Sequence, residues 1–164
     1  MLKGLFQKKK NSQIEEVLSP MRGKVIPVTE VPDPVFAQRM MGDGIAIIPK
    51  SEKVVSPVNG RVIQVFPTKH AIGIQSEHGL ELLIHIGLET VELKGEGFEV
   101  FVEEDQRVKA GDHLANVDLA YLKRNNKQVV TPMIITNMEK VSNVEASNQK
   151  EASWGDVLLH CSLK

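Results

Sequence analysis

Five histidines give this chain its clearest capacity for chemistry, and two of them belong to neighbouring strand-like runs. The reference pKa of histidine is about 6.5, so at neutral pH an uncharged, nucleophilic ring nitrogen is available for proton or phosphoryl transfer. His70 opens the run 70–76, and His85 lies within the run 80–86. These two histidines are therefore the first candidates for a catalytic pair.

The connection between the two runs decides whether the histidines meet. A hairpin that pairs Ser76 with Gly79 places His70 directly opposite His85, with Cβ atoms about 4.5–5.5 Å apart. A three-residue connection places them on opposite faces, because a slip of one residue inverts the side-chain pattern. At this level both registers remain open.

The other reactive groups fit structural roles better. His78 falls in the turn between the two runs, His113 follows a turn at Gly111, and His160 lies on the polar face of the run 157–163. Cys161 has neighbours that alternate toward the interior, which favours a buried thiol over a nucleophile. A glycine-rich loop with the Lys and Ser/Thr of nucleotide sites is absent from the sequence, so ATP is not the expected phosphoryl donor.

The elements that must position the two histidines are short strands. Val and Ile dominate the chain, and Gly, Pro, Asn and Asp interrupt it every several residues. Alternating runs predict strands at 24–28, 60–66, 71–76, 80–86 and 157–163, with short helical turns at 35–41 and 119–125. We predict an all-β fold, an antiparallel β-sandwich or flattened barrel with Greek-key-like connections.

An internal echo accompanies this pattern. Residues 19–28 read SPMRGKVIPV and residues 56–65 read SPVNGRVIQV. Each combines a turn with Pro at its second position, a Gly, and then a strand. Two tight turns can converge on such a pattern by chance, or two similar halves can pair into one sandwich.

Length and charge restrict the classes of protein. The chain has 164 residues and a formal net charge of −1, which fits one ordinary globular domain and gives no electrostatic reason to bind nucleic acid. We predict a flexible basic tail at 1–16 and a single domain at 17–164. The tail is a solvated segment or a weak membrane or partner contact. With one cysteine and neither a secretory signal nor a long apolar run, a reducing cytoplasm is expected.

Several segments resemble one known family, the glucose-type enzyme IIA component of the bacterial phosphoenolpyruvate-dependent sugar phosphotransferase system. PTKHAIGI (67–74) and LLIHIGLETVELKGEGF (82–98) resemble its two active-site segments. The stretches at 31–47, 56–62 and 131–139 resemble three others, in the same order along the chain.

The resemblance implies roles for individual residues. His85 would carry the phosphoryl group on Nε2, His70 would donate a hydrogen bond to that group, and Thr68 would hold the ring of His70. A shallow hydrophobic rim around the histidines would be formed by Val35, Phe36, Met40, Met41, Phe66, Leu83 and Val91. The family often has Asp where this chain has Glu89, and some members have aromatics in place of Leu83 and Ile86, which bears on partner preference.

The resemblance also implies partners. The phosphoryl group would come from phospho-HPr and would be passed to a IIB domain of a sugar permease. The protein would contact the membrane only through that permease. Regulated transporters or kinases are possible further partners. No cofactor is required, although some members share a zinc ion between the two histidines and a partner protein.

Two other classes of function compete with a phosphoryl carrier. The repeated Pro-Gly-Val turns resemble the biotinyl or lipoyl carrier domains, but the Met-Lys-Met or Asp-Lys-Ala hairpin tip that such a domain needs is missing from the sequence. A regulatory binding module is compatible with the carrier, since one apolar face can serve several partners.

Overall fold

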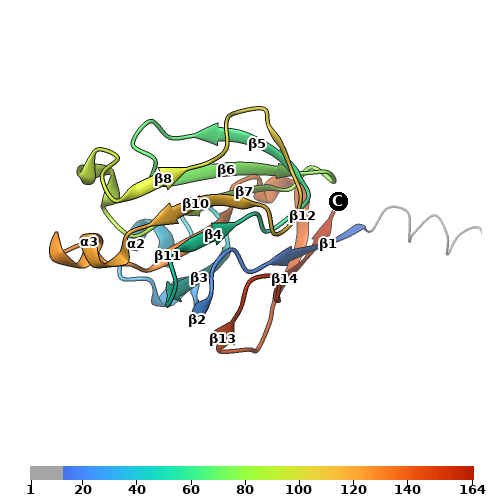
Figure 1. The fold of residues 1–164 in the computed structure, drawn as a ribbon. Coiled ribbons are helices and arrows are strands. Elements are labelled where there is room, and N and C mark those ends of the chain that lie inside the picture. Colours follow the sequence, from blue (N-terminus) through green and yellow to red (C-terminus); the bar gives the residue numbers. More distant parts are fainter. Residues whose placement is uncertain (1–12) are drawn as a thin grey trace, which may run out of the picture.

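The computed structural model describes residues 13–164, and within them the strands form three antiparallel sheets (Figure 1). The largest sheet has eight strands in the order β13 (Glu151–Ala152), β2 (Gly23–Pro27), β3 (Gly44–Pro49), β11 (Thr131–Ile135), β7 (Glu81–His85), β6 (Ala71–Ser76), β5 (Gly60–Val65) and β9 (Arg107–Val108). A second sheet has the order β4 (Lys53–Val55), β10 (His113–Val117) and β8 (Phe98–Val100). The third has the order β1 (Gln13–Leu18), β14 (Val157–Leu163) and β12 (Val141–Ala146).

Helical structure is confined to short segments, as the sequence predicted. They are η1 (Val28–Glu30), α2 (Pro34–Ala37), η2 (Thr90–Leu93), α3 (Leu119–Arg124) and η3 (Met138–Lys140). The all-β prediction is confirmed, and the described residues form an open sandwich, since the eight-stranded sheet ends at β13 and β9 without closing into a barrel. Strand β11 lies between β3 and β7 in the sheet, although both are far from it in sequence. Such long connections between neighbouring strands agree with the expected Greek-key-like topology.

The boundary of the predicted tail needs a correction. Gln13–Leu18 forms β1, which pairs antiparallel with β14 from Gln13 opposite Leu163 onward. Residues 13–16 are therefore part of the sandwich, because their backbone groups complete the edge of its third sheet. The prediction of a flexible tail at residues 1–12 lies outside the described residues.

The internal echo corresponds to a local symmetry of the fold. The Ser19 hydroxyl donates to the carbonyl of Met21 over 2.6 Å, and the Ser56 hydroxyl makes the equivalent bond to Val58 over 2.7 Å. The two turns also bind each other, since the N–H of Leu18 donates to Pro57 and that of Val55 donates to Pro20. The two turns thus bind each other reciprocally, whereas the strands that follow them, β2 and β5, are separated by four strands of the large sheet.

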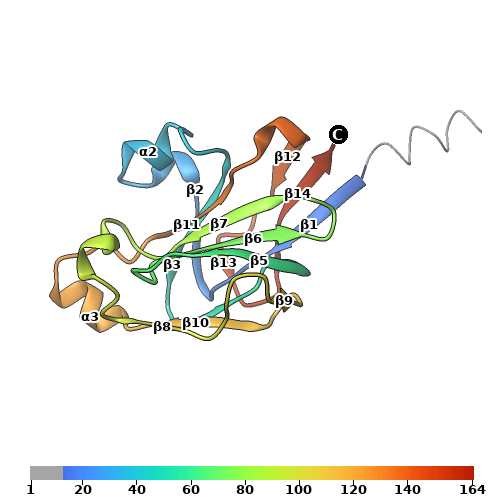
Figure 2. The same cartoon turned by 90° about the horizontal axis from the view of Figure 1, so that it is seen from above.

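Alternation along β6 and β7 divides their side chains between two layers. Ile72, Ile74, Leu82 and Ile84 are fully or almost fully buried in the main core, which also contains Leu114 and other residues of the second sheet. On the opposite face, α2 covers the eight-stranded sheet, and Figure 2 shows α2 and the strands β8 and β10 on its two sides. A smaller apolar cluster that includes Phe36 of α2 packs there.

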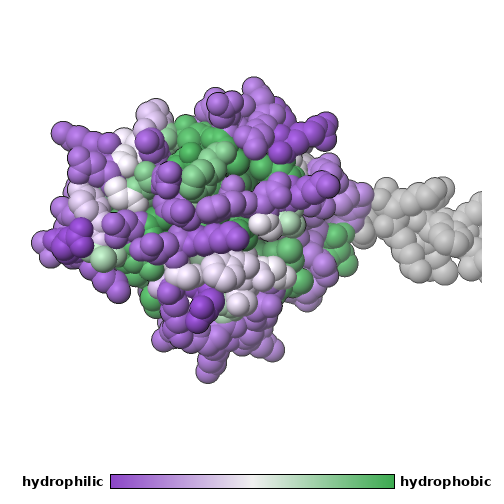
Figure 3. Space-filling model, viewed as in Figure 1, coloured by the Kyte–Doolittle hydropathy of each residue, from purple (hydrophilic) through white to green (hydrophobic). Residues whose placement is uncertain are grey.

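The outer surface of the second sheet has an ordinary polar character. On the side that carries β8, β10 and β4, polar residues cover most of the surface, with hydrophobic side chains between them (Figure 3). Phe101, which is 45% exposed, packs beside the ring of His113. The main core therefore lies between the large sheet and the second sheet. The histidine pair lies on the other face of the large sheet, the face that α2 covers.

Candidate active site

His85 is the last residue of β7 and lies on the α2 face of the large sheet. The ladder pairs it with Ala71 of β6, and Ile84, one position earlier, points into the main core. Phe36 packs against it with ring centroids 5.1 Å apart. Asp33 caps the start of α2 by accepting a hydrogen bond from the N–H of Val35, and Pro34 occupies the first turn, which explains why a helix begins here.

The structure brings His70 against His85, and of the two hairpin registers that the sequence left open it has the one with the three-residue connection. Gln75 pairs with Glu81 and Ala71 with His85, so the connection is longer by one residue than the pairing of Ser76 with Gly79 requires. Strict alternation along β6 would then separate the two histidines. Their ring centroids are nevertheless 4.9 Å apart, with an interplanar angle of 81°.

The backbone just before β6 accounts for this meeting. Lys69 has φ of 63°, in the left-handed region, and its N–H closes a turn on the carbonyl of Phe66 over 2.7 Å. His70 therefore follows a turn and is not itself part of β6. For this reason its side chain can lie on the same side of the sheet as His85, although the alternation of β6 would place it on the other side. Its carbonyl still accepts the N–H of Ile86 over 2.7 Å, which ties the turn to the end of β7.

A backbone carbonyl sets the tautomer of His85. Nδ1 of His85 lies 2.8 Å from the carbonyl oxygen of Gly87. A carbonyl oxygen accepts but never donates, so Nδ1 carries the hydrogen in the neutral ring. The lone pair is then on Nε2, which is the nitrogen that can act as a nucleophile.

The ring of His70 is held from its other side. Nδ1 of His70 lies 2.7 Å from the hydroxyl oxygen of Thr68, and Phe66 packs edge-on against the ring with centroids 5.3 Å apart. His70 is 4% exposed, and its position is therefore well defined by packing. The structure thus brings His85, His70 and Thr68 together in one chain of contacts, as predicted.

Both imidazoles are neutral at neutral pH. Burial, with a smaller contribution from the neighbouring His85, lowers the pKa of His70 from 6.5 to about 4. Burial also lowers the pKa of His85, although the hydrogen bond to Gly87 and the carboxylate of Asp33 act in the opposite direction. The pair therefore offers an uncharged nucleophile beside an uncharged hydrogen-bonding ring.

The residues of the predicted rim divide into two groups. Phe36 and Phe66 contact the histidine rings and Leu83 is a buried residue of β7, two positions before His85. The remaining four are large hydrophobic side chains exposed to solvent: Val35, Met40, Met41 and Val91. Contiguous exposed apolar patches, rather than single exposed residues, mark surfaces that bind other proteins.

Sequence reasoning missed two groups that act on His85. The carbonyl of Gly87 sets its tautomer, and the charge of Asp33 acts on its pKa. The Asp-Pro pair at 33–34 is a recognisable helix start, and that signal could have drawn attention to Asp33. Gly87 acts through its backbone carbonyl, which every residue has, so the residue type gives no sign of this role.

The other reactive groups have ordinary surroundings. His78 and His160 are within ion-pair distance of Glu15 and Glu16, and His113 is within 2.7 Å of the side-chain oxygen of Asn116. Cys161 is fully buried, which confirms the prediction of a buried thiol, and burial raises its pKa to about 12. Residues 13–164 contain no cluster of three or more His, Cys, Asp or Glu placed to bind a metal.

Comparison with known proteins places these features in a family. Residues 15–141 match the family described as phosphoenolpyruvate-dependent sugar phosphotransferase system, EIIA 1, a match that contains the histidine pair and most of the fold. The chain belongs to this family. It is a phosphotransferase component, a phosphoryl carrier of the sugar phosphotransferase system.

Individual relatives cover nearly the whole chain. A Bacillus cereus protein named PTS system glucose-specific EIIA component is 49% identical over 155 residues, which are 94% of either chain. A Staphylococcus aureus protein of the same name is 46% identical over 157 residues, 95% of either chain. The solved structure of glucose permease IIA from Mycoplasma capricolum is 46% identical, with a TM-score of 0.84 over 90% of this chain and 96% of that one.

The helices of this EIIA family member are short. Among residues 13–164, none of them has the length and apolar character that crossing a membrane requires.

Proposed function

We propose that Nε2 of His85 takes the phosphoryl group from phospho-HPr and passes it to a cysteine of the IIB domain of a glucose-family sugar permease. In the first step the lone pair of Nε2 forms the new N–P bond as the bond between phosphorus and the donor nitrogen of HPr breaks. In the second step a cysteine thiolate of IIB forms the S–P bond and His85 leaves as the neutral imidazole. The observation that carries the proposal is the hydrogen bond from Nδ1 of His85 to Gly87, which leaves Nε2 unprotonated.

His70 has a different role in this proposal. We assign the Thr68 hydroxyl as the hydrogen-bond donor to Nδ1 of His70, from which it lies 2.7 Å away. In that tautomer Nε2 of His70 carries the hydrogen and donates a hydrogen bond to the phosphoryl oxygens. The transferring group gathers charge on these oxygens, and a positioned donor beside it lowers the barrier. The second imidazole thereby takes the part that a metal ion plays in many phosphoryl-transfer sites, and the proposal needs no resident cofactor.

The exposed rim residues are the docking surface in this proposal. Val35, Met40, Met41 and Val91 are 38–68% exposed in the free protein, and a partner that covers them removes apolar surface from water. The same closure excludes water from the labile phosphohistidine during transfer. We place this exchange in the cytoplasm, where the free thiol of Cys161 is stable and where the permease presents its IIB domain.

The experiment that tests the proposal is a reconstituted phosphorylation. The full chain is incubated with phosphoenolpyruvate, enzyme I and HPr, and the modified residue is mapped by mass spectrometry. We expect one phosphoryl group, on His85, in the wild-type chain and in a variant His78→Ala, which removes an exposed histidine. Phosphate on another residue, or uptake that does not depend on HPr, would contradict the proposal.

A further inference from the structure

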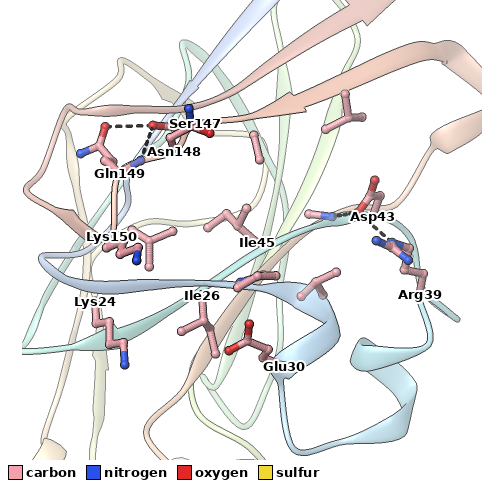
Figure 4. A pocket seen from close by; sticks show the side chains of 16 residues that line it. Lys24, Ile26, Glu30, Arg39, Asp43, Ile45, Ser147, Asn148, Gln149 and Lys150 are labelled. Carbon is pink, nitrogen blue, oxygen red and sulfur yellow. Dashed lines mark hydrogen bonds and ion pairs between the residues drawn. The ribbon is translucent and has the colours of Figure 1, made fainter.

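A cleft of about 630 Å³ lies away from the two histidines, lined by β2, the start of β3 and the turn at 147–150 (Figure 4). On its wall, Arg39 and Asp43 bind each other at 3.1 Å. The lining includes neither of the histidines nor any residue of the segment 86–90, which follows β7. The groups that orient His85 thus lie apart from this open cleft, in a buried part of the molecule.

The residue that orients His85 is a glycine, and a glycine does little to restrict its own backbone. The carbonyl oxygen of Gly87 lies 2.8 Å from Nδ1 of His85 and holds the hydrogen of the neutral ring on that atom. Because it has no Cβ, Gly87 can adopt φ of either sign, and here its φ is 75°. Neighbouring groups therefore have to fix the direction of its carbonyl.

The peptide group between Ile86 and Gly87 is held at both ends by threonine side chains. The hydroxyl of Thr90 donates to the carbonyl oxygen of Ile86 over 2.7 Å. The N–H of Gly87 lies 3.4 Å from Oγ1 of Thr131, whose own hydrogen is donated to the carbonyl of Val129. The C=O and N–H of a trans peptide point in opposite directions, so the two threonines restrain this group from opposite sides. The contact made by Thr90 is short and that made by Thr131 is long, so Thr90 is the stronger restraint.

Thr90 also contacts Gly87 through its methyl group. A Cβ placed on Gly87 would lie 2.7 Å from Cγ2 of Thr90, so this methyl group fills the space beside the glycine. Thr90 is fully buried and is the first residue of η2. Water therefore does not compete for its hydroxyl. Both branches of the side chain act on the backbone that precedes the carbonyl of Gly87.

We propose that Thr90 is a positioning residue for phosphoryl transfer, because its hydroxyl fixes the peptide group of Ile86 and Gly87 and so keeps the hydrogen of the His85 ring on Nδ1. Thr90 acts through Gly87 and not on the phosphoryl group itself. Loss of the hydroxyl lets the peptide group rotate, and the neutral ring then populates the tautomer with the hydrogen on Nε2, which has no lone pair there to attack phosphorus. The effect of Thr90 on transfer rests on the function proposed above, whereas its effect on the ring does not.

Nitrogen-15 NMR of the imidazole rings tests this proposal on the full chain, at a pH where both rings are uncharged. Thr90→Val keeps the shape of the side chain and removes the hydroxyl. We expect signals of the Nε2-protonated tautomer of His85 to appear in this variant, and uptake from phospho-HPr to slow about three- to tenfold, the usual effect of one lost hydrogen bond. Thr90→Ser keeps the hydroxyl and should keep the Nδ1-protonated tautomer. An unchanged tautomer in Thr90→Val, or the same change in Thr90→Ser, would overturn the proposal.

Ser56→Ala is a matched control for the loss of a buried hydroxyl. The hydroxyl of Ser56 is fully buried and donates to the carbonyl of Val58 over 2.7 Å. Ser56 precedes the start of β5, whereas the histidine pair lies beyond the end of that strand, next to Phe66. We expect Ser56→Ala to lower the stability as Thr90→Val does, and to leave the tautomer of His85 and the rate of uptake unchanged. A tautomer change of the same size in Ser56→Ala would assign the effect to general loosening of the fold and overturn the proposal.

The wild-type chain supplies a measurement that does not depend on the folding of any variant. We expect its His85 to be protonated on Nδ1 and the hydroxyl proton of Thr90, which is buried and bonded, to exchange slowly with water. A wild-type His85 protonated on Nε2, or a rapidly exchanging Thr90 hydroxyl, would overturn the proposal. If both expectations hold and the wild-type chain takes no phosphoryl group from phospho-HPr, the proposed function fails while the role of Thr90 in holding the ring stands.

Discussion

The imidazole rings of His70 and His85 stand nearly perpendicular, with centroids 4.9 Å apart and an interplanar angle of 81°. One ring is tied through Nδ1 to the carbonyl of Gly87 and the other through Nδ1 to the hydroxyl of Thr68. The Nε2 atom of each ring is therefore available to a ligand. The two rings differ in the group that holds Nδ1, a carbonyl for His85 and a hydroxyl for His70. This difference is the basis of the separate roles predicted for the two histidines.

Substitution of each histidine should block a different step. His85→Ala removes the acceptor nitrogen, so uptake from phospho-HPr should vanish. His70→Gln keeps a hydrogen-bond donor of similar reach, so uptake should persist while onward transfer to IIB slows by about 10²–10³, the usual cost of one lost charge-stabilising donor. Phosphoprotein yield and transfer rate for the two variants, measured side by side, check this. Uptake that fails in His70→Gln and survives in His85→Ala would mean that the roles are reversed.

The stability of the fold should depend on the protonation of His70. Its pKa is about 4 in the folded chain and 6.5 ordinarily, so between these values the unfolded chain binds more protons than the folded one. Stability should therefore be full above pH 6.5 and decline as the pH falls toward 4. Denaturant unfolding at several pH values measures the free energy of unfolding. In His70→Asn this free energy should change less between pH 6.5 and pH 4 than in the wild-type chain. An identical slope in the variant would assign the effect to other groups. The lowered pKa of His85 acts in the same direction and keeps its Nε2 free at neutral pH.

The hydroxyl of Thr68 should matter for transfer more than for folding. Thr68→Val keeps the shape of the side chain and removes the bond to Nδ1 of His70, whereas Thr68→Ser keeps the hydroxyl. We expect transfer to IIB to slow about three- to tenfold in the valine variant, since a hydrogen bond contributes about 0.5–1.5 kcal/mol. The serine variant should stay close to wild type. Equal rates for both variants would show that the hydroxyl does not hold the ring.

Gly87 should be sensitive to a methyl group because of its surroundings as well as its backbone angle. Gly87 has φ of 75°, and a Cβ there would lie 2.7 Å from Cγ2 of Thr90 and 2.9 Å from the carbonyl oxygen of Gln128. Gly79 has φ of 96° with open space around it, so Gly79→Ala carries backbone strain alone. We expect Gly87→Ala to be less stable than Gly79→Ala by about 1–3 kcal/mol. It should also slow phosphoryl uptake, because the carbonyl that orients His85 must move.

Chemical denaturation and the uptake assay on both glycine variants check this comparison. Matching losses of stability in the two would show that strain alone decides the cost. Unchanged uptake in a folded Gly87→Ala would show that its carbonyl does not orient His85.

The exposed rim should be needed for docking and not for folding. Met40 is 68% exposed, so Met40→Asp should leave the stability nearly unchanged and slow uptake from phospho-HPr about tenfold, the effect of a significant interface contact. Ile14 of β1 is 61% exposed, and Ile14→Asp is a matched control that should not affect uptake. Uptake kinetics at limiting HPr measure the difference. A similar effect in both variants would remove Met40 from the docking surface.

The sequence predicted the local elements well where alternation is strict. The runs at 71–76 and 157–163 coincide with β6 and β14, since buried branched residues there leave one arrangement of faces. Near the start of the chain, the prediction of a tail was wrong for Gln13–Glu16. These residues are polar, but they form part of β1 because they pair with β14. Pairing with a strand some 150 residues away has no local signal.

For the candidate site, residue types and motifs in the sequence determined which residues matter: a histidine in each of two adjacent runs, a threonine two positions before the first, and apolar residues nearby. How the two histidines meet was decided by the tertiary structure. The hairpin has the register that should separate them, and the left-handed turn at Lys69 returns His70 to the side of His85. The tautomer of His85 likewise depends on a carbonyl, and the lowered pKa values depend on burial. Such effects arise when chain segments pack, because backbone direction and desolvation are properties of the assembled fold and not of any residue type.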